Sequence, residues 1–498
     1  MPSRLWKRLA VTLHLSTDYS EKPAGLKWRS STFFIVATVA IGLFADMFMY
    51  GLIVPILPFM LEDRVHLPKD QVQSAVAGLL ASYAGASVLF CPIAGFVADK
   101  TSTRQLPFLL GLTALLGATF LLFIGTDLPV LFIARILQGI SAAVVWTIGL
   151  ALCVETVGPQ NLGTTIGSIF SFTSVGNLSA PLLGGILYEK VSYAGVFILA
   201  FAILAVDFLM RLLVIEKKTA QRYYDEDSDD TSSDTNTTSS SNIDNDHEGN
   251  NDGGSNNEEQ PLLGNSEDLS RYKFTTTPSA LAHKIPILPC LKDPGLLTAF
   301  VLVFVYAILL GSFDATVPTV AQEYFGFDSM KAGLLFLPLG IFDLLLGPLA
   351  GWAVDRLGTK SVSVAGYAYL VPVLVLLRLP HAGGNPQIIL YNCLLALCGV
   401  GLAIIGAPSY VEAGTIVQKY FDANPEFFGE GGGPYAQLYG LSNMVFSAGL
   451  AVGPELASEL KQAIGYGNAN LVLAIICFVT AVMSFFFIGD RPKFLRRA

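Results

Sequence analysis

Long apolar runs are the feature that most limits what this chain can fold into. About 20 helical residues cross a bilayer core of roughly 30 Å, so an apolar run of that length is best explained as a transmembrane helix. The sequence contains six such runs, then a polar insert, then six more. The runs lie near residues 32–60, 72–97, 106–125, 128–154, 162–187, 191–215, 296–322, 330–354, 360–379, 387–416, 435–460 and 468–489. The pattern predicts an all-α membrane protein in which twelve transmembrane helices form two pseudo-symmetric six-helix halves.

The same runs divide the chain into five regions. Because the number of spans is even, both termini lie on one side of the membrane, and the basic residues near both ends place that side in the cytosol. We expect a cytosolic tail at 1–31, an N-terminal half at 32–215, a disordered acidic cytosolic loop at 216–291, a C-terminal half at 292–490 and a cytosolic tail at 491–498.

The composition agrees with a polytopic membrane protein. Of the 498 residues, 52% are apolar and only 14% are charged, whereas a soluble domain carries about 25% charged residues. The net charge of −9 comes from the insert, because residues 225–260 hold twelve acids and no Lys or Arg. The chain has no Walker motif, metal-spaced His/Cys set or nucleophile elbow. We therefore expect no enzymatic activity, no cofactor, no metal ion and no nucleic-acid partner.

One ten-residue stretch occurs twice at matching positions. Gly95–Arg104 reads GFVADKTSTR and Gly351–Lys360 reads GWAVDRLGTK, and each copy closes the second apolar run of its half. An ordinary charged turn would explain one copy but hardly two in corresponding places. A repeat on both sides of an insert indicates two related halves of one membrane protein.

Charged residues inside the apolar runs are the candidate functional groups. Asp46 lies roughly midway along the first run. A carboxylate there costs at least ~2.5–3.5 kcal/mol on insertion scales, so it should face the bundle interior and bind something. Tyr50 shares its helix face. The alternative is a structural Asp that is hydrogen-bonded to a neighbouring helix.

The fourth and fifth runs carry further signals. Arg135 lies more than one turn inside the fourth run and needs a carboxylate or carbonyl partner, unless its side chain snorkels to the outer interface. In the fifth run, Gly176, Ala180 and Gly184 recur every four positions, so a neighbouring helix can approach closely, and Pro181 can bend the helix. Tight packing alone would account for these residues, and a role in alternating access is a separate hypothesis.

These motifs together resemble the major facilitator superfamily. The first repeat resembles its best known motif, between the second and third spans. Arg135-Ile-Leu-Gln-Gly resembles its fourth-span motif. A stretch of the fifth run resembles the fifth-span motif of the proton-coupled antiporters in this superfamily, with Ala180 where Gly is usual. That stretch comprises Gly176, Ala180, Pro181, Gly184 and Gly185.

The surroundings of Asp46 and of the fourth- and fifth-span motifs are similar to the vesicular amine transporters, within the drug:proton antiporter group, and suggest a fungal-type multidrug or amine antiporter. Asp314 occupies the position where those proteins keep a Glu. The chain has Tyr83, Pro408 and Asn443 where they keep Lys, Asp and Asp. The resemblance therefore leaves the substrate and the proton route open.

What the resemblance implies is a secondary transporter that exchanges protons for a small organic solute, such as an amine, a drug or a secondary metabolite. A proton-coupled importer on the same fold and a non-transporting receptor or scaffold are the alternatives. We expect a monomer in the lipid bilayer whose partners are its solute and protons. The substrate- and proton-binding candidates are Asp46, Tyr50, Arg135, Asn177, Asp314, Glu412 and Asn443. The candidate conformational latch comprises Gly95, Asp99, Lys100, Arg104, Gly351, Asp355, Arg356 and Lys360.

The acidic insert contains one short motif of a different kind. Glu258 precedes the pair Leu262-Leu263 by four residues. This spacing resembles an acidic dileucine sorting signal, which a sorting adaptor reads. It favours a vacuolar or endosomal membrane, with the plasma membrane as the alternative.

Overall fold

The chain is described here from a computed structural model. The described residues are 23–54, 56–101, 104–158, 161–221, 223, 271–274, 280–327, 329–428 and 433–489. The predicted sorting signal and the predicted tail at 491–498 lie outside them.

Twelve long helices form the body of the described protein, six in each half. The N-terminal six are α3 (Thr32–Ile53), α5 (Lys69–Lys100), α6 (Gln105–Ile124), α7 (Leu128–Val157), α8 (Leu162–Lys190) and α9 (Tyr193–Leu213). The C-terminal six are α13 (Pro294–Phe325), α15 (Phe336–Leu357), α16 (Thr359–Leu376), α17 (Asn385–Gly406) continued by α18 (Pro408–Ala423), α20 (Tyr435–Ile464) and α21 (Tyr466–Phe487). The short helices are α2 (Leu26–Arg29), α4 (Leu57–Asp63), α12 (Ala280–Lys284), η2 (Cys290–Lys292), α14 (Ser329–Leu334) and α19 (Pro425–Phe428).

Most of these long helices are apolar enough to cross a membrane. Within the described residues, 11 stretches meet the requirements of length and composition, and α17 with α18 forms one of them. The twelfth span is α20. Its 30 residues are long enough, but polar residues such as Gln437, Ser442 and Asn443 lower its hydropathy. The predicted twelve-helix, all-α architecture in two halves is confirmed.

Local sequence explains several helix ends. The Asp293 carboxylate accepts the backbone N–H of Gly295 at 2.7 Å, and Pro294 occupies the first position of α13, so this start combines a capping side chain with a proline. The same helix ends at Gly326, which has the left-handed conformation with φ of 63° that glycine adopts without steric cost.

The predicted N-terminal tail is too wide. Helix α2 lies within residues 1–31, and Arg29 at its end is buried. The Arg29 Nε donates to the backbone carbonyl of Leu213 at 2.5 Å. This contact joins α2 to the end of α9, because a buried guanidinium needs acceptors.

The predicted disordered loop is also too wide at its C-terminal flank. The backbone N–H of Phe274 donates to Asn424 Oδ1 at 3.0 Å, and Asn424 Nδ2 donates to the carbonyl of Tyr272 at 2.8 Å. The Phe274 ring stacks on Tyr420, with centroids 5.8 Å apart. Aromatic side chains at this flank have apolar surface to bury, so the segment packs on α18 and α19.

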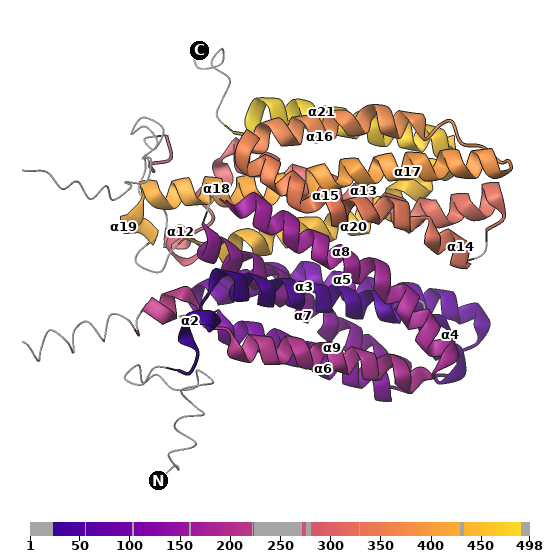
Figure 1. The fold of residues 1–498 in the computed structure, drawn as a ribbon, viewed down its shortest axis with the longest axis horizontal. Coiled ribbons are helices and arrows are strands. Elements are labelled where there is room, and N and C mark those ends of the chain that lie inside the picture. The colour runs from indigo at the N-terminus through magenta and orange to yellow at the C-terminus, as the bar shows by residue number, and fades with distance from the viewer. Residues whose placement is uncertain are drawn as a thin grey trace, which may run out of the picture.

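Two pairs of helices form most of the contact between the halves, and α7 also contacts α20. Helix α5 packs against α20, and α8 packs against α15, between the indigo-to-magenta half and the orange-to-yellow half in Figure 1. A methyl group at Gly95 would overlap the carbonyl of Ala436, and one at Gly351 would overlap the carbonyl of Gly163. Glycine is therefore what permits the two backbones to touch. We call the end of the bundle that carries these contacts the motif end; it lies near α18, to the left in Figure 1.

The fifth-span stretch packs within its own half. A methyl group at Gly184 would overlap the carbonyl of Leu52, and one at Gly51 would meet the Ala180 methyl group. Gly176 faces Phe44 in the same way, whereas Gly185 has no atom within 4 Å of its Cβ position. Helix α8 thus approaches α3 as closely as the four-residue spacing predicts.

Candidate functional site

The Asp46 carboxylate lies on α3 inside the N-terminal half. Its side chain is only 2% exposed, and Trp146 Nε1 on α7 donates to its Oδ2 at 3.0 Å. The Tyr83 hydroxyl of α5 also interacts with this carboxylate. Trp146 and Arg135 lie on the same face of α7, but nothing in the sequence pattern indicated that Trp146 binds Asp46.

Arg135 lies on α7 and is fully buried, so the snorkelling interpretation is wrong. Its Nη1 donates to Gln138 Oε1 at 2.8 Å. The rings of Tyr50 and Tyr83 have their centroids 5.4 and 5.7 Å from the guanidinium carbon. Among the described residues, no carboxylate forms an ion pair with Arg135.

Asp314 reaches the same region from the other half. It lies well inside α13 and is nevertheless exposed. It is close enough to the Tyr50 hydroxyl of the N-terminal half for its charge to act on that group. Tyr50 thus has both Arg135 and Asp314 as electrostatic neighbours, and it lies one helical turn after Asp46 on α3.

The other predicted binding residues have different surroundings. Asn443 on α20 is buried, and its Nδ2 has no partner among the described residues. Asn177 on α8 is exposed. Glu412 on α18 accepts hydrogen bonds from the Thr359 hydroxyl and from the backbone N–H of Gly489, the latter at 2.9 Å. Glu412 is thus part of the motif end and not of the region around Asp46.

Two polar features were not assigned from the sequence. Asp343 on α15 accepts a hydrogen bond from the Ser174 hydroxyl of α8, across the contact between the halves. Arg211 and Asp207 on α9 form a fully buried ion pair at 2.7 Å, close to Asp46. The four-residue spacing of this acid and base within an apolar run is a signal that could have indicated the pair.

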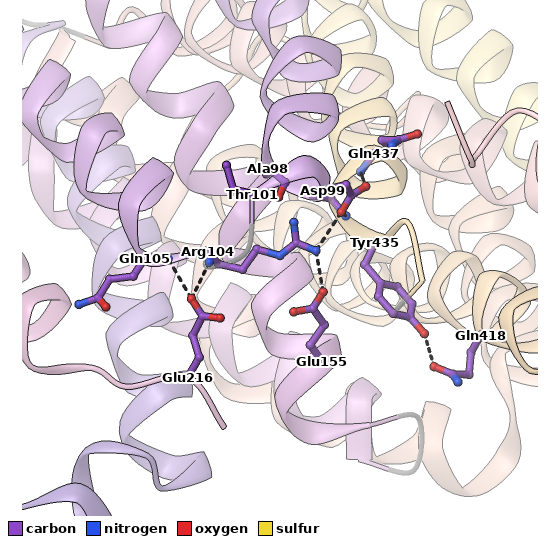
Figure 2. A network of polar contacts seen from close by, with 11 residues as sticks. Ala98, Asp99, Thr101, Arg104, Gln105, Glu155, Glu216, Gln418, Tyr435 and Gln437 are labelled. Carbon is purple, nitrogen blue, oxygen red and sulfur yellow. Dashed lines mark hydrogen bonds and ion pairs between the residues drawn. The ribbon is translucent and has the colours of Figure 1, made fainter. Parts of the chain in front are cut away.

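The first motif copy holds the start of α20. Asp99 accepts the backbone N–H groups of Ala436 and Gln437 at 3.1 and 2.8 Å. Arg104 Nη2 donates to Asp99 at 2.9 Å and to Glu155 at 2.7 Å (Figure 2). A carboxylate at the positive end of a helix is favourable, so this network fastens the N-terminal half to the C-terminal half.

Glu216 completes this network from the end of α9. Its carboxylate accepts the backbone N–H groups of Arg104 and Gln105 at 2.5 and 2.9 Å (Figure 2). Glu216 lay in the predicted loop and carried no recognisable motif, so the sequence did not indicate its role.

The second motif copy holds the start of α8 in the same way. Asp355 accepts the backbone N–H groups of Gly163 and Thr164 at 2.7 and 2.8 Å, and the Thr164 hydroxyl at 2.7 Å. Each Asp of the repeat thus caps a helix of the opposite half, and the two contacts are related by the pseudo-symmetry.

The remaining predicted latch residues lie around these caps. Lys100 and Arg356 are exposed and lie over the rings of Phe96 and Trp352, at 4.1 and 5.9 Å. Lys360 lies 5.2 Å from the ring centroid of Phe485. The basic side chains of the second copy thus differ in placement from Arg104.

Comparison with known proteins supports a common family. Residues 39–424 match the sequence profile of the Major Facilitator Superfamily. The MFS-type transporter ppzB of Metarhizium rileyi is 43% identical over 472 residues, which are 94% of this chain and 97% of that protein. The MFS-type transporter C18.02 of Schizosaccharomyces pombe is 37% identical over 461 residues, which are 92% and 96% of the two chains.

More distant similarity extends to proteins with named substrates. The vesicular acetylcholine transporter of Drosophila melanogaster is 22% identical over 472 residues, covering 88% of this chain and 69% of that protein. The crystal structure of the human organic anion transporter MFSD10 superposes with a TM-score of 0.62 at 15% identity, covering 91% of this chain and 99% of that chain. The profile match, the full-length relatives and the shared fold show that this multi-pass membrane protein belongs to the Major Facilitator Superfamily and is a transporter of that family.

Proposed function

We propose that the protein is a proton-coupled antiporter of a small organic solute. The observation that carries this proposal is that each half contributes a carboxylate to one intramembrane region: Asp46 lies one turn before Tyr50 on α3, and Asp314 acts on Tyr50 from α13. A carboxylate is able both to hold a proton and to neutralise a cation, and intramembrane carboxylates typically mark such pathways.

The contacts between the halves support alternating access. At the motif end they consist of glycine contacts and of two carboxylates that cap helices of the opposite half. Such contacts break as units when two rigid halves rock about a midplane site. We propose that the motif end faces the cytosol, in which case this is the state that is closed to the cytosol.

The proposed solute class includes organic cations. The Drosophila relative is named for acetylcholine, which is a quaternary ammonium ion, and Asp46 and Asp314 supply the negative charges that such a solute needs. We place the protein in the vacuolar or endosomal membrane, where antiport against protons leads to sequestration.

The test is a flux measurement on the purified wild-type protein in liposomes with an acidic interior and an enclosed pH dye. Acetylcholine and other quaternary ammonium ions are added outside, because a permanent charge prevents their passive entry as neutral bases. We expect the interior to become alkaline faster than in protein-free liposomes, since each solute that enters drives protons out.

Two outcomes would count against this proposal. Solute accumulation without proton movement would make the protein a uniporter. Accumulation driven by an acidic exterior, with protons entering alongside the solute, would support the importer alternative.

A further inference from the structure

We infer that Arg135 and Asp314 are the two poles of a binding site for solutes that carry both an anionic and a cationic group, an inference that rests on the proposed transport of an organic solute. The occupant is a zwitterion with a carboxylate and an ammonium group, such as an amino acid or a metabolite of similar charge. The positive pole belongs to the N-terminal half and the negative pole to the C-terminal half.

The positive pole is a guanidinium with an unused edge. Arg135 is fully buried, and its Nε and Nη2 have no hydrogen-bond partner among the described residues, while Nη1 is occupied by Gln138. Nε and Nη2 form one edge of the planar guanidinium, with two parallel N–H donors. This is the edge that matches the two oxygens of a carboxylate.

The surroundings of Arg135 leave this charge uncompensated. Tyr50 and Tyr83 offer it only their ring faces, and a buried charge without a hydrogen-bonded partner is unfavourable. Asp46 does not neutralise it, because that carboxylate accepts the Trp146 N–H and interacts with the Tyr83 hydroxyl and the Asp207–Arg211 pair.

The negative pole is likewise unpaired. Asp314 has no hydrogen bond or ion pair with another described residue, and it is exposed although it lies well inside α13. It is near enough to the Tyr50 hydroxyl for its charge to act on that group, and Tyr50 in turn lies against Arg135. Two unpaired, opposite charges near one tyrosine, one from each half, suit a solute that brings the complementary charges in a single molecule.

Such a solute would also couple binding to movement. A zwitterion that neutralises Arg135 in one half and Asp314 in the other links the halves directly. A solute with one charged group would leave the other pole unpaired when the site closes, so we expect it to be transported more slowly than a zwitterion.

The test is the thermal unfolding of the full-length protein in detergent with three matched probes. L-phenylalanine is the zwitterion, N-acetyl-L-phenylalanine is the anion and L-phenylalanine methyl ester is the cation. We expect all three to raise the unfolding temperature of the wild type, and the zwitterion to do so at the lowest concentration.

Variants separate the two poles. Arg135→Gln should weaken the response to the N-acetyl probe about ten- to a hundredfold, because charge-assisted hydrogen bonds are lost, and should keep the response to the ester. Asp314→Asn should do the reverse. Arg378→Gln, which removes an exposed arginine far along the C-terminal half, is the matched control and should respond like the wild type.

Three results would overturn the inference. One is a wild type that does not respond to the anion or the zwitterion. Another is an Arg135→Gln variant that still responds to the anion. The third is evidence that Arg135 and Asp314 pair directly with each other. In that case the double variant Arg135→Asp with Asp314→Arg would keep wild-type thermal stability, and no probe would bind.

The liposome flux assay separates this inference from the proposed function. If flux is proton-coupled but Arg135→Gln still responds to the anionic probe like the wild type, only the inference is wrong. The expected binding pattern without proton movement defeats only the antiport mechanism.

Discussion

At the scale of single residues, the four central side chains differ in how well they are satisfied. Asp46 is buried and hydrogen-bonded to Trp146, whereas Arg135 has an unused edge and Asp314 is unpaired among the described residues. Groups held in place are suited to a fixed role such as proton binding. Groups left unsatisfied are suited to a ligand that comes and goes.

Asp46→Asn is the variant that tests the proton-binding role. Asn keeps an oxygen for the Trp146 N–H and nearly the same volume, so expression and thermal stability should remain close to wild type. Coupled transport should fall about a hundredfold or more, which is the lower part of the range for loss of a proton-transfer group.

The measurement for Asp46→Asn is the proton-coupled liposome flux described above. Asp127→Asn, at an exposed carboxylate before α7, is the control and should transport normally. A wild-type rate of coupled transport in Asp46→Asn would make Asp46 a structural residue, and Asp314 would then be the candidate for proton binding.

At the scale of helices, the motif end is closed by two equivalent devices. Asp99 caps α20 and Asp355 caps α8. Next to each cap, a glycine brings the two backbones into contact. The closed state therefore depends on a carboxylate at the N-terminus of a helix from the opposite half. It also depends on a glycine that lies one helical turn before that carboxylate.

Asp99→Asn should shift the protein toward opening at the motif end. The amide replaces one acceptor by a donor that faces a backbone N–H, and it removes the negative charge from the helix terminus, at a cost of about 0.3–2 kcal/mol. Asp355→Asn should act in the same direction, because it removes the equivalent cap.

Labelling of Cys91 reports this shift. Cys91 is buried where α5 meets α20, so N-ethylmaleimide, followed by mass spectrometry, should label it faster when the motif end opens. A well-folded Asp99→Asn variant with wild-type labelling and wild-type turnover would remove the latch role.

Gly95→Ala tests the packing part of the same device. The added methyl group would overlap the carbonyl of Ala436, and overpacking of this kind costs about 1–3 kcal/mol. This corresponds to an increase of roughly five- to over a hundredfold in the open population, which faster Cys91 labelling would reveal.

Gly85→Ala is the matched control on the same helix, because no atom lies within 4 Å of its Cβ position. It should leave labelling unchanged. Equal labelling of the two variants would show that the contact between α5 and α20 does not limit opening.

At the scale of the whole molecule, the central insert joins two halves that share one large hydrophobic core cluster. Its C-terminal flank is anchored through Tyr272 and Phe274 on the α18–α19 region. The anchor holds this flank beside the motif end, on the face of the bundle that we propose to be cytosolic.

Replacing both Leu262 and Leu263 by Ala tests where the protein resides. If the acidic dileucine pattern is read by a sorting adaptor, the variant should move from an internal membrane to the cell surface in fluorescence microscopy. Transport by the purified variant should be unchanged, because the candidate transport residues lie in the two halves and not in the insert. An unchanged cellular distribution would exclude the sorting role.

The sequence by itself determined the architecture of this protein. The number of spans, the two halves and the repeated motif follow from the length of apolar runs and from spacing along the chain, and both are one-dimensional properties. The small-residue spacing of the fifth span likewise predicted its close contact with a neighbour, although not that α3 is the neighbour.

Only the tertiary structure decided which polar groups meet. Asp99 binds backbone groups more than 300 residues away, and Glu412 joins the motif end although it was predicted to bind protons. Arg135 was expected to find a carboxylate or carbonyl partner, and the tertiary structure supplies the amide carbonyl of Gln138 together with two tyrosine rings. Apolar patterning specifies that a residue faces inward, but its partner depends on how helices from the two halves cross, and no local spacing encodes that geometry.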